Sequence, residues 1–396
     1  MILRNQIGTN FSWLILFYSV SVFGIEDNTK LKLEMIQVLF RHGARTPVAC
    51  EAKLVSNGNN SLYDPWGIAQ LTNNGMMQEY NIGKMLRDRY KSFLPDLYRQ
   101  KDVYAYASDT SRTQASLLLV LAALYPPTNQ LKWNNKLDWL PIPIHSNPRR
   151  LDILIKSRIC PTFGQALHQL LSTKEMLSLL EKHRPVIEKM REVYWKSFNL
   201  RDIFCAYNAI KVHKEMNLPM PSWYTDELYS DLNEAKEFYL NALSYTDILK
   251  KLNGGPIVRR FLKNMNDTHW KTNKRKIYLY SAHDKTLHAF LKVHDVLDVK
   301  QPKYGATIIL EKYRGEQNQS YVRFLYWPCG SQEIETITLK TCTEMCPFKN
   351  YVEIIKPHLP SDDDMLCLYK NIQPEIMEGI INPDTTIAGV NKNYVV

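Results

Sequence analysis

The heptapeptide Arg41 to Pro47 (RHGARTP) places one histidine, His42, between two arginines, Arg41 and Arg45. Arginine presents a planar, permanently charged fork that binds phosphate oxygens in pairs. A histidine among such arginines can attack phosphorus directly, because the positive surroundings lower its pKa and keep the attacking nitrogen unprotonated. A lone histidine in a basic turn would be read as structural. Here the clustered positive charge is costly to hold without an anion, so the heptapeptide predicts phosphoryl chemistry.

A second candidate is the pair His283-Asp284 within Ser281 to Thr286 (SAHDKT). Cleavage of a phosphate ester releases an alkoxide or phenoxide, which departs more easily when a carboxylic acid protonates it. Asp284 is the candidate proton donor, and the neighbouring His283 can bind phosphate as an imidazolium. A His-Asp pair is usually structural, so a catalytic role for this pair is supported only by its position in the chain.

Three short apolar runs precede the polar clusters that carry these residues. The runs are Leu33 to Phe40, Val103 to Ala107 and Ile277 to Tyr280, and the second leads into Ser108 to Arg112 (SDTSR). Near-continuous apolar runs of this length are typical of strands buried on both faces. Open α/β sheets bind ligands at the C-terminal ends of their strands, so we expect the three clusters to meet there.

Helical patterns separate the predicted strands. Thr72 to Tyr90 and Thr113 to Leu124 are expected to be helices, and Ser56 to Asn60 is expected to be an exposed loop.

A long middle section, about 163–265, is expected to be helical with irregular connections. Within it, Ser172 and Glu175 have the spacing of a capping box. A further helix is expected at Ala235 to Leu252, with Gly254-Gly255 as its stop signal. A helical block inside an α/β chain predicts an inserted cap domain.

The bulk composition is that of a globular protein. The chain has 396 residues, of which 45% are hydrophobic and 23% charged, with a formal net charge of +10. Length alone favours roughly two to three domains. Basic residues are scattered among acids without a long run or an aromatic stripe, which argues against nucleic-acid binding and favours a solubilising surface.

The N-terminus has the pattern of a signal peptide. Arg4 precedes an apolar stretch, Phe11 to Phe23, and Val22 and Gly24 suit cleavage before Ile25. An uncleaved anchor is the alternative, but the stretch is short for a bilayer span, and 385–396 is mixed and polar. The prediction is a soluble, secreted protein with no membrane anchor.

Seven cysteines fit an oxidising compartment, where most are expected to pair. The spacing of Cys342 and Cys346 would also suit a metal. No second ligand pair at zinc spacing accompanies them, so a short-loop disulfide is favoured and no metal is predicted. An odd count leaves at least one thiol free or paired with another chain. Three acceptor triplets for N-glycosylation begin at Asn59, Asn266 and Asn318.

The order and spacing of five segments resemble the signatures of the histidine acid phosphatases. The segments are RHGARTP, LTNNGMMQEYNIGKMLRDRY (71–90), SDTSRTQAS (108–116), PIPIHS (141–146) and SAHDKT. The likeness runs from about Leu31 to Cys367 and is strongest to the prostatic and lysosomal type, including secreted insect and venom enzymes.

The resemblance implies an α/β fold of the phosphoglycerate mutase-like, histidine phosphatase kind. Its mixed, largely parallel sheet would carry helices on both faces, with a helical cap domain added. The implied division is a signal peptide at 1–24, a catalytic domain at 25–160 and 255–396, and a cap at 161–254.

The resemblance also implies roles for the site residues. Arg41, Arg45 and Arg112 would clamp the phosphoryl oxygens, and His283 would join that pocket. His42 would be phosphorylated transiently, and Asp284 would protonate the leaving group. No metal or other cofactor would be needed, because guanidinium groups neutralise the phosphate charge.

Further features follow from the resemblance alone. Trp139 and His145 match positions at a homodimer contact, although a Trp and a His in a proline-rich turn explain them equally well. Cys160 with Cys367, and Cys342 with Cys346, match family disulfides. The usual partner of Cys205 would lie near residues 304–307, where no cysteine occurs; Cys50 and Cys329 are additional, so the pairing of these three stays open.

The leading hypothesis is a secreted, non-specific acid phosphatase acting on phosphate monoesters, with lysosomal residence as an alternative location. A phytase or inositol-polyphosphate phosphatase is a rival, but the basic residues of the cap segment have helical surface spacing and are mixed with acids. A phosphoglycerate mutase-like role suits a secreted chain of this length less well. A non-catalytic binding protein would be expected to have lost His42, an arginine or Asp284, and none is lost. The natural substrate and the tissue are not readable from the sequence.

Overall fold

The computed structural model describes residues 31–56, 58–194, 197–266, 275–296, 300–331 and 333–367. The predicted signal peptide at 1–24 and the polar segment at 385–396 lie outside the described residues.

A seven-stranded mixed sheet forms the centre of the molecule, in the order β2-β3-β1-β4-β5-β6 with β7 paired to β5. The strands are β1 (Lys32–Arg41), β2 (Val103–Ala107), β3 (Ile277–Ala282), β4 (Thr307–Arg314), β5 (Ser320–Trp327), β6 (Glu335–Thr336) and β7 (Cys346–Pro347). The three predicted strands are confirmed as β1, β2 and β3, which are parallel neighbours. Strands β4 to β7 pair antiparallel. The mixed sheet is therefore confirmed, with its parallel part confined to the three strands that lead into the predicted site.

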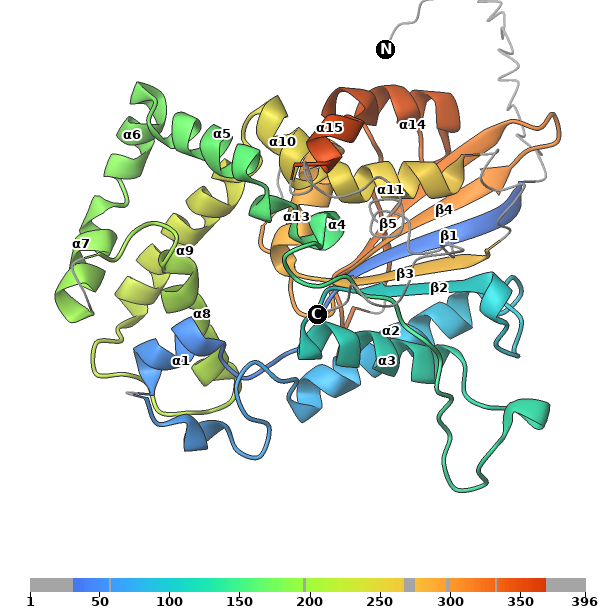
Figure 1. The fold of residues 1–396 in the computed structure, drawn as a ribbon, viewed down its shortest axis with the longest axis horizontal. Helices are drawn as coiled ribbons and strands as arrows, with labels where there is room; N and C mark the ends of the chain where they lie inside the picture. The colour runs from blue at the N-terminus through green and yellow to red at the C-terminus, as the bar shows by residue number, and fades with distance from the viewer. Residues whose placement is uncertain are drawn as a thin grey trace, which may run out of the picture.

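Helices cover both faces of the sheet (Figure 1). On one face lie α2 (Asn73–Arg89) and α3 (Ser111–Leu124); on the other lie α11 (Gly255–Met265), α13 (Asp284–Val293) and α14 (Phe348–Ile355). Alternate residues of β1 enter different cores: Val38 packs with the α2–α3 side and Leu39 with the α11–α13 side. Burial on both faces explains why this strand is apolar without alternation.

A second hydrophobic core lies in the helical region beside the sheet, at the left of Figure 1. Its helices are α5 (Pro161–Leu171), α6 (Lys174–Glu181), α7 (Arg184–Val193), α8 (Ile203–Glu215), α9 (Asp226–Ala242) and α10 (Asp247–Asn253). Helix α1 (Ala49–Val55), which directly follows the heptapeptide, adds Leu54 to this core. We call α1 and α5 to α10 the cap; the domain boundary at 161–254 stays a prediction.

Two short helices and five 3-10 turns complete the described structure. The helices are α4 (Ile153–Lys156) and α15 (Asp362–Met365), and the turns are Asn60–Tyr63, Gln100–Asp102, Asn129–Leu131, Ser157–Ile159 and Lys356–His358.

Two local predictions were wrong, and a third is confirmed only in part. The helix expected at 235–252 is two helices, because the Thr246 hydroxyl accepts a hydrogen bond from Leu249 N (3.3 Å) and caps a new helix, α10. Thr173, not Ser172, caps α6, because its hydroxyl accepts from Met176 N. In the loop expected to be exposed at 56–60, residues 58–60 are exposed as predicted, but Ser56 is buried and its hydroxyl donates to Ala52 O. Gly254 ends α10, as its sequence position predicts.

The structure pairs Cys160 with Cys367 and Cys342 with Cys346, which are the pairs that the resemblance implies. It also joins Cys50 to Cys205, which links α1 to α8, and leaves Cys329 as a free thiol. The cysteine pairs that the sequence left open are thereby assigned.

Candidate active site

The turn after β1 and the turn after β3 lie side by side. The register aligns Arg41 with Ala282, and His42 N donates a hydrogen bond to Ala282 O (3.1 Å). The rings of His42 and His283 consequently face each other edge-on, with centroids 5.4 Å apart. Parallel pairing thus brings together two clusters that are more than 200 residues apart in sequence.

Two glycines allow the heptapeptide to pack directly against the first turn of α2. A Cβ on Gly43 would lie 2.3 Å from Gly75 O, and one on Gly75 would lie 1.9 Å from Ala44 O. Both positions exclude any side chain. Thr72 caps α2 at this point, and its backbone N–H donates to Ala44 O (3.0 Å), which fixes the turn.

His42 is held in the tautomer that a nucleophile requires. Its Nδ1 lies 2.9 Å from Gly43 O, a carbonyl that can only accept, so Nδ1 carries the hydrogen. Nε2 therefore carries no proton, and its lone pair accepts a hydrogen bond from Arg112 Nε (3.1 Å). Burial, followed by the charges of Arg112, Arg41 and Arg45, holds the pKa of His42 well below its ordinary value.

Each arginine of the heptapeptide is fixed from one side. Arg41 donates to Pro302 O (2.6 Å), and its guanidinium carbon lies 3.9 Å from the centroid of the Tyr304 ring. Arg45 forms a bidentate pair with the buried Glu51 at 2.6 and 2.8 Å. Burial disfavours the charge on Arg45, but Glu51 outweighs it and raises the pKa of Arg45. Burial and then Arg45 lower the pKa of Arg112 to about 10, so Arg112 remains cationic at physiological pH.

Asp284 lies among hydrogen-bond donors at the start of α13. Gln301 Nε2 donates to its Oδ2 (2.5 Å), Lys285 N donates to its Oδ1 (2.7 Å), and Arg41 lies 3.4 Å away. Burial raises the pKa of Asp284, but Arg41, Lys285 and Gln301 together outweigh burial and lower it. The carboxylate is therefore ionised in the empty site. A bound phosphate would offset the charge of Arg41 and shift the pKa of Asp284 upward.

His283 shares its Nε2 between two neighbours, Ser108 Oγ at 2.8 Å and Lys156 Nζ at 2.6 Å. Burial, followed by the charges of Lys156 and Arg112, holds the pKa of His283 well below its ordinary value. Its environment favours a neutral ring, whereas the sequence predicts an imidazolium that binds phosphate. Lys156 supplies the positive charge at this position instead.

A comparison with protein families decides the class of this site. Residues 32–327 match the family model described as "Histidine phosphatase superfamily (branch 2)". The chain belongs to this family.

Curated relatives of this branch 2 histidine phosphatase carry the names of acid phosphatases. It is 32% identical over 357 residues to "Venom acid phosphatase Acph-1" of Apis mellifera, covering 88% of this chain and 91% of that protein. It is 29% identical to "Prostatic acid phosphatase" of Homo sapiens, covering 86% and 89%. It is 27% identical to "Lysosomal acid phosphatase" of Homo sapiens, covering 89% and 84%.

Solved structures show the same fold at lower identity. A phytase of Klebsiella sp. ASR1 superimposes with a TM-score of 0.63 at 14% identity, covering 84% of this chain and 97% of that chain. A phytase of Citrobacter braakii superimposes with a TM-score of 0.62 at 13% identity, covering 84% and 99%. At these identities the likeness concerns the fold of this branch 2 histidine phosphatase alone.

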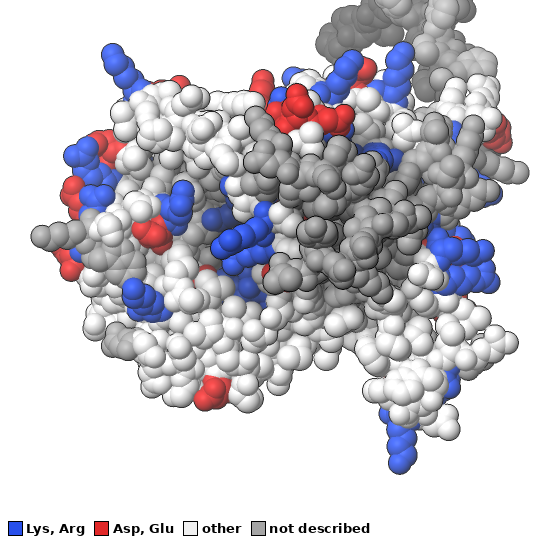
Figure 2. Space-filling view, in the orientation of Figure 1, with Lys and Arg blue, Asp and Glu red and all other residues white. Residues whose placement is uncertain are grey.

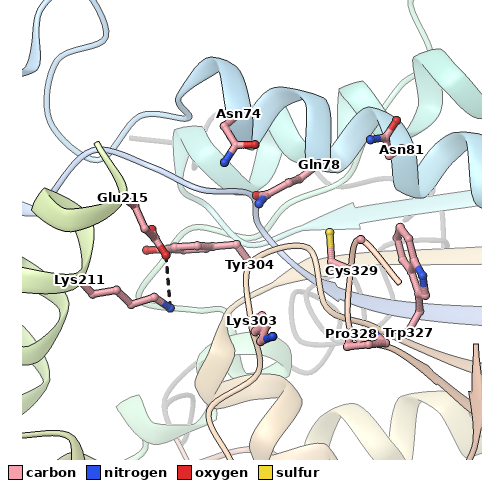
Figure 3. A pocket seen from close by; sticks show the side chains of 11 residues that line it. Asn74, Gln78, Asn81, Lys211, Glu215, Lys303, Tyr304, Trp327, Pro328 and Cys329 are labelled. Carbon is pink, nitrogen blue, oxygen red and sulfur yellow. Dashed lines mark ion pairs between the residues drawn. The ribbon is translucent and has the colours of Figure 1, made fainter. Parts of the chain in front are cut away.

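A cavity of about 490 Å³ opens beside the site in this family member (Figure 3). Asn74 and Gln78 of α2 line one side, and Lys211 and Glu215 of α8 line another. The ring of Tyr304 lies between this cavity and Arg41. Burial and then Arg41 lower the pKa of Lys211 to about 8. The cavity offers room for the part of a substrate that lies beyond its phosphate.

The fold brings together the site residues that the sequence predicts. They are Arg41, His42, Arg45, Arg112, His283 and Asp284. Sequence reasoning assigned no role to a second set that contacts them, namely Glu51, Ser108, Lys156, Gln301 and Tyr304. Ser108 could have been found, because it belongs to the polar cluster that follows β2. The other four lie in loops and short helices, and no local sequence pattern predicts where the fold places them.

The remaining predicted residues lie away from this site. Asn59, Asn266 and Asn318 are exposed, as glycosylation requires. His145 pairs with the edge of β2 and stacks on Tyr104, with ring centroids 5.0 Å apart, and Trp139 is half-buried nearby in the chain. Among the described residues there is no group of three or more His, Cys, Asp or Glu that would hold a metal ion, and no helix is long and apolar enough to cross a membrane.

Proposed function

We propose that the chain is a secreted acid phosphatase that hydrolyses phosphate monoesters through a phosphohistidine at His42, with Asp284 as proton donor. The observation that carries this proposal is the geometry of His42. Its Nε2 lone pair faces the guanidinium of Arg112, and its pKa stays low enough for attack in acid. The names of the curated relatives support the activity and a secreted or lysosomal location.

The reaction has two steps that use the same residues. In the first step the P–N bond forms and Asp284 gives up a proton, and in the second the P–N bond breaks and Asp284 takes up a proton. His42 Nε2 attacks phosphorus, the ester P–O bond breaks, and the leaving oxygen takes a proton from Asp284. Arg41, Arg45 and Arg112 stabilise the charge on the three non-bridging oxygens. Water then attacks phosphorus, Asp284 accepts its proton, and the P–N bond breaks to release phosphate and His42.

The low pKa of Asp284 in the empty site makes the substrate the source of its proton. A phosphate monoester has a second pKa of about 6, so below that pH it arrives as a monoanion that carries one proton. Binding offsets the arginine charges and lets Asp284 hold that proton until the ester bond breaks. Activity should therefore fall as pH rises through this value, while His42 stays unprotonated on the acid side.

The homodimer with Trp139 and His145 at its contact is supported by the resemblance alone, as is glycosylation at the three exposed asparagines. The phytase neighbours share the fold at 14% identity or less, which does not favour that substrate class for this chain. A non-catalytic binding role would leave the complete set of site residues unexplained.

The test is hydrolysis of p-nitrophenyl phosphate as a function of pH, with a chelator present. We expect acid-range activity in the wild type that disappears in His42→Ala and is kept in His168→Ala, which removes an exposed imidazole on α5. Rapid quenching into alkali should trap radiolabelled phosphate on the wild type and not on His42→Ala. A folded wild type without activity would overturn the proposal and favour a binding protein.

A further inference from the structure

Helix α9 of the cap carries a buried lysine, Lys236. On the face that Figure 2 shows, Lys and Arg side chains of the cap, at the left, lie on the molecular surface beside Asp and Glu. The side chain of Lys236 is instead only 2% exposed. Its neighbours on α9, Leu232, Ala235 and Leu240, belong to the apolar core of the cap. Well-packed apolar side chains are often at least as stable as a buried ion pair, so stability alone does not explain an ammonium group at this position.

Three oxygens surround the ammonium group of Lys236. Its Nζ donates to Asn233 Oδ1 (2.9 Å) and to Gln301 Oε1 (3.1 Å). The third oxygen, Glu237 Oε1, lies 3.0 Å from Nζ. An ammonium group has three donors and no acceptor, so these oxygens can satisfy it completely. The Tyr207 ring lies against it, with its centroid 3.9 Å from Nζ. The protein itself therefore occupies every contact that this lysine can make.

Gln301 connects Lys236 to the candidate proton donor. It lies in the segment between α13 and β4, and its Nε2 donates to Asp284 Oδ2 at 2.5 Å. Its backbone N–H donates to Glu237 Oε1 at 3.3 Å. Helix α9 thus holds both the main chain and the side chain of Gln301, and that side chain reaches Asp284.

The two side-chain contacts fix the direction in which the Gln301 amide points. Its oxygen must face Lys236, because an ammonium group only donates, and its nitrogen must then face Asp284. Gln301 can therefore donate to the carboxyl group but cannot accept a proton from it. If the amide were turned over, its oxygen would accept a hydrogen bond from protonated Asp284 and would compete with the leaving group for that proton.

The segment that contains Gln301 also holds Arg41 beside the same carboxyl group. Arg41 donates to the carbonyl of Pro302, the next residue, at 2.6 Å, and its guanidinium lies 3.4 Å from Asp284 Oδ2. The other oxygen, Oδ1, accepts a hydrogen bond from Lys285 N (2.7 Å). Each carboxyl oxygen consequently has its own donor, and together these contacts oppose rotation of the carboxyl group.

We propose that Lys236 and Gln301 are positioning residues for the proton donor Asp284. Lys236 sets the orientation of the Gln301 amide. Gln301 in turn holds the Asp284 carboxyl group in place and leaves its proton to the leaving group of the substrate. The cap thereby contributes to proton transfer through α9. This inference rests on the proposed phosphatase function and adds two residues to its machinery.

The test compares kcat/KM for β-glycerophosphate, whose alkoxide needs a proton, with kcat/KM for p-nitrophenyl phosphate, whose phenolate leaves without one. Both esters form the same phosphohistidine, so the ratio of the two values reports on departure of the leaving group. In Lys236→Met and in Gln301→Leu we expect this ratio to fall roughly tenfold, a part of the about 10²–10⁴-fold that a general acid contributes. Lys182→Met removes an exposed lysine that pairs with Glu234 of α9 at 2.9 Å, and it should keep the wild-type ratio.

A double variant tests whether Lys236 acts through Gln301. If it does, Lys236→Met/Gln301→Leu should show the same ratio as Gln301→Leu alone, whereas independent effects would multiply. A ratio lowered by the product of the two single losses would contradict the link between these residues. Thermal unfolding checks that each variant is folded, and Gln301→Leu tests the contact with Asp284 even if Lys236→Met does not fold.

The remaining outcomes separate this inference from the general activity. If Asp284→Asn lowers the ratio and folded Gln301→Leu does not, the positioning role is overturned and the phosphatase proposal stands. Equal losses on the two esters in Gln301→Leu would also overturn it, because they would assign this residue to structural support of the site. Absence of p-nitrophenyl phosphate hydrolysis in the wild type would overturn the phosphatase proposal itself.

Discussion

The proposed roles of His42 and Asp284 depend on opposite effects of the same positive charge. Burial and the charges of Arg112, Arg41 and Arg45 keep His42 unprotonated, as a nucleophile must be, but Arg41 also keeps Asp284 ionised, which a proton donor must not be. This conflict would be removed when the substrate's phosphate binds Arg41, Arg45 and Arg112, which we call the arginine clamp. The negative charge of the phosphate would then offset the arginine charges that act on both His42 and Asp284. Under the proposed mechanism, Asp284 becomes a competent acid only after the substrate is bound.

Replacing Asp284 tests its role through the choice of leaving group. In Asp284→Asn we expect kcat on β-glycerophosphate, whose alkoxide needs a proton, to fall on the order of 10²–10⁴-fold, the usual contribution of a general acid. The fall on p-nitrophenyl phosphate should be at least about tenfold smaller, because p-nitrophenolate is a stable anion that leaves without help. Parallel steady-state measurements on the two esters, at the same pH, provide the comparison.

An equal loss on both esters would contradict a role in protonation and assign Asp284 to phosphate positioning through Arg41. Thr286→Ser serves as a control on the same helix turn, because it keeps the hydroxyl that donates to Ile155 O.

At the scale of elements, the cap helix α1 connects Arg45 to the rest of the cap. Glu51 of this helix holds Arg45, and the adjacent Cys50 is bonded to Cys205 of α8. Leu54 of the same helix is buried in the hydrophobic core of the cap. One helix thus joins Arg45, which we propose binds phosphate, to the rest of the cap by an ion pair, a disulfide and apolar packing.

Removing the bridge between α1 and α8 should affect both stability and phosphate binding. The bridge closes a loop of 155 residues, so the chain-entropy model gives it roughly 5 kcal/mol, against roughly 2 kcal/mol for the Cys342–Cys346 bridge, whose separation is 4. In Cys50→Ser/Cys205→Ser we expect a lower Tm and, well below that Tm, a KM for p-nitrophenyl phosphate raised several-fold with a smaller change in kcat. Thermal unfolding and steady-state kinetics measure the two effects.

The matched control is Cys342→Ser/Cys346→Ser, which opens a bridge that does not involve α1. It should lose less stability and keep the wild-type KM. If the α1–α8 variant also keeps its KM, the ion pair and the apolar contacts position Arg45 without the disulfide.

Across the whole molecule, the sequence predicted what local patterns encode. Apolar runs and the polar residues after them located β1, β2 and β3 and the six residues that the fold brings together. The split between α9 and α10 also had a local signal, the Thr246-Asp247 cap, which the longer apolar pattern obscured. No local sequence pattern predicts the contacts of Glu51 with Arg45 and of Lys156 with His283. These contacts depend on where tertiary packing places α1 and α4.

A buried histidine far from the site sets a further pH dependence for the whole fold. His294, at the end of α13, has its Nδ1 2.8 Å from Phe290 O and its Nε2 3.0 Å from the Tyr351 hydroxyl of α14. Burial lowers its pKa to about 4, which the Phe290 carbonyl only partly opposes. In the unfolded chain the same group titrates near its ordinary value of about 6.5. Between these two values the unfolded state binds more protons, so stability falls as pH falls through this window.

Replacing this imidazole should flatten the dependence of stability on pH. In His294→Phe we expect the free energy of unfolding to change less steeply between about pH 6.5 and 4, by up to about 1.4 kcal/mol per pH unit. The variant should be less stable than the wild type near neutral pH by about 1–3 kcal/mol, because the Tyr351 hydroxyl loses its partner, and the two curves should approach each other in acid. Urea unfolding at a series of pH values measures both curves, with His168→Gln as an exposed control.

Parallel curves for His294→Phe and wild type would show that His294 is not neutral in the folded protein. Converging curves would show that His294 is neutral in the folded protein and that protonation of the same imidazole in the unfolded chain lowers the stability of the fold in acid.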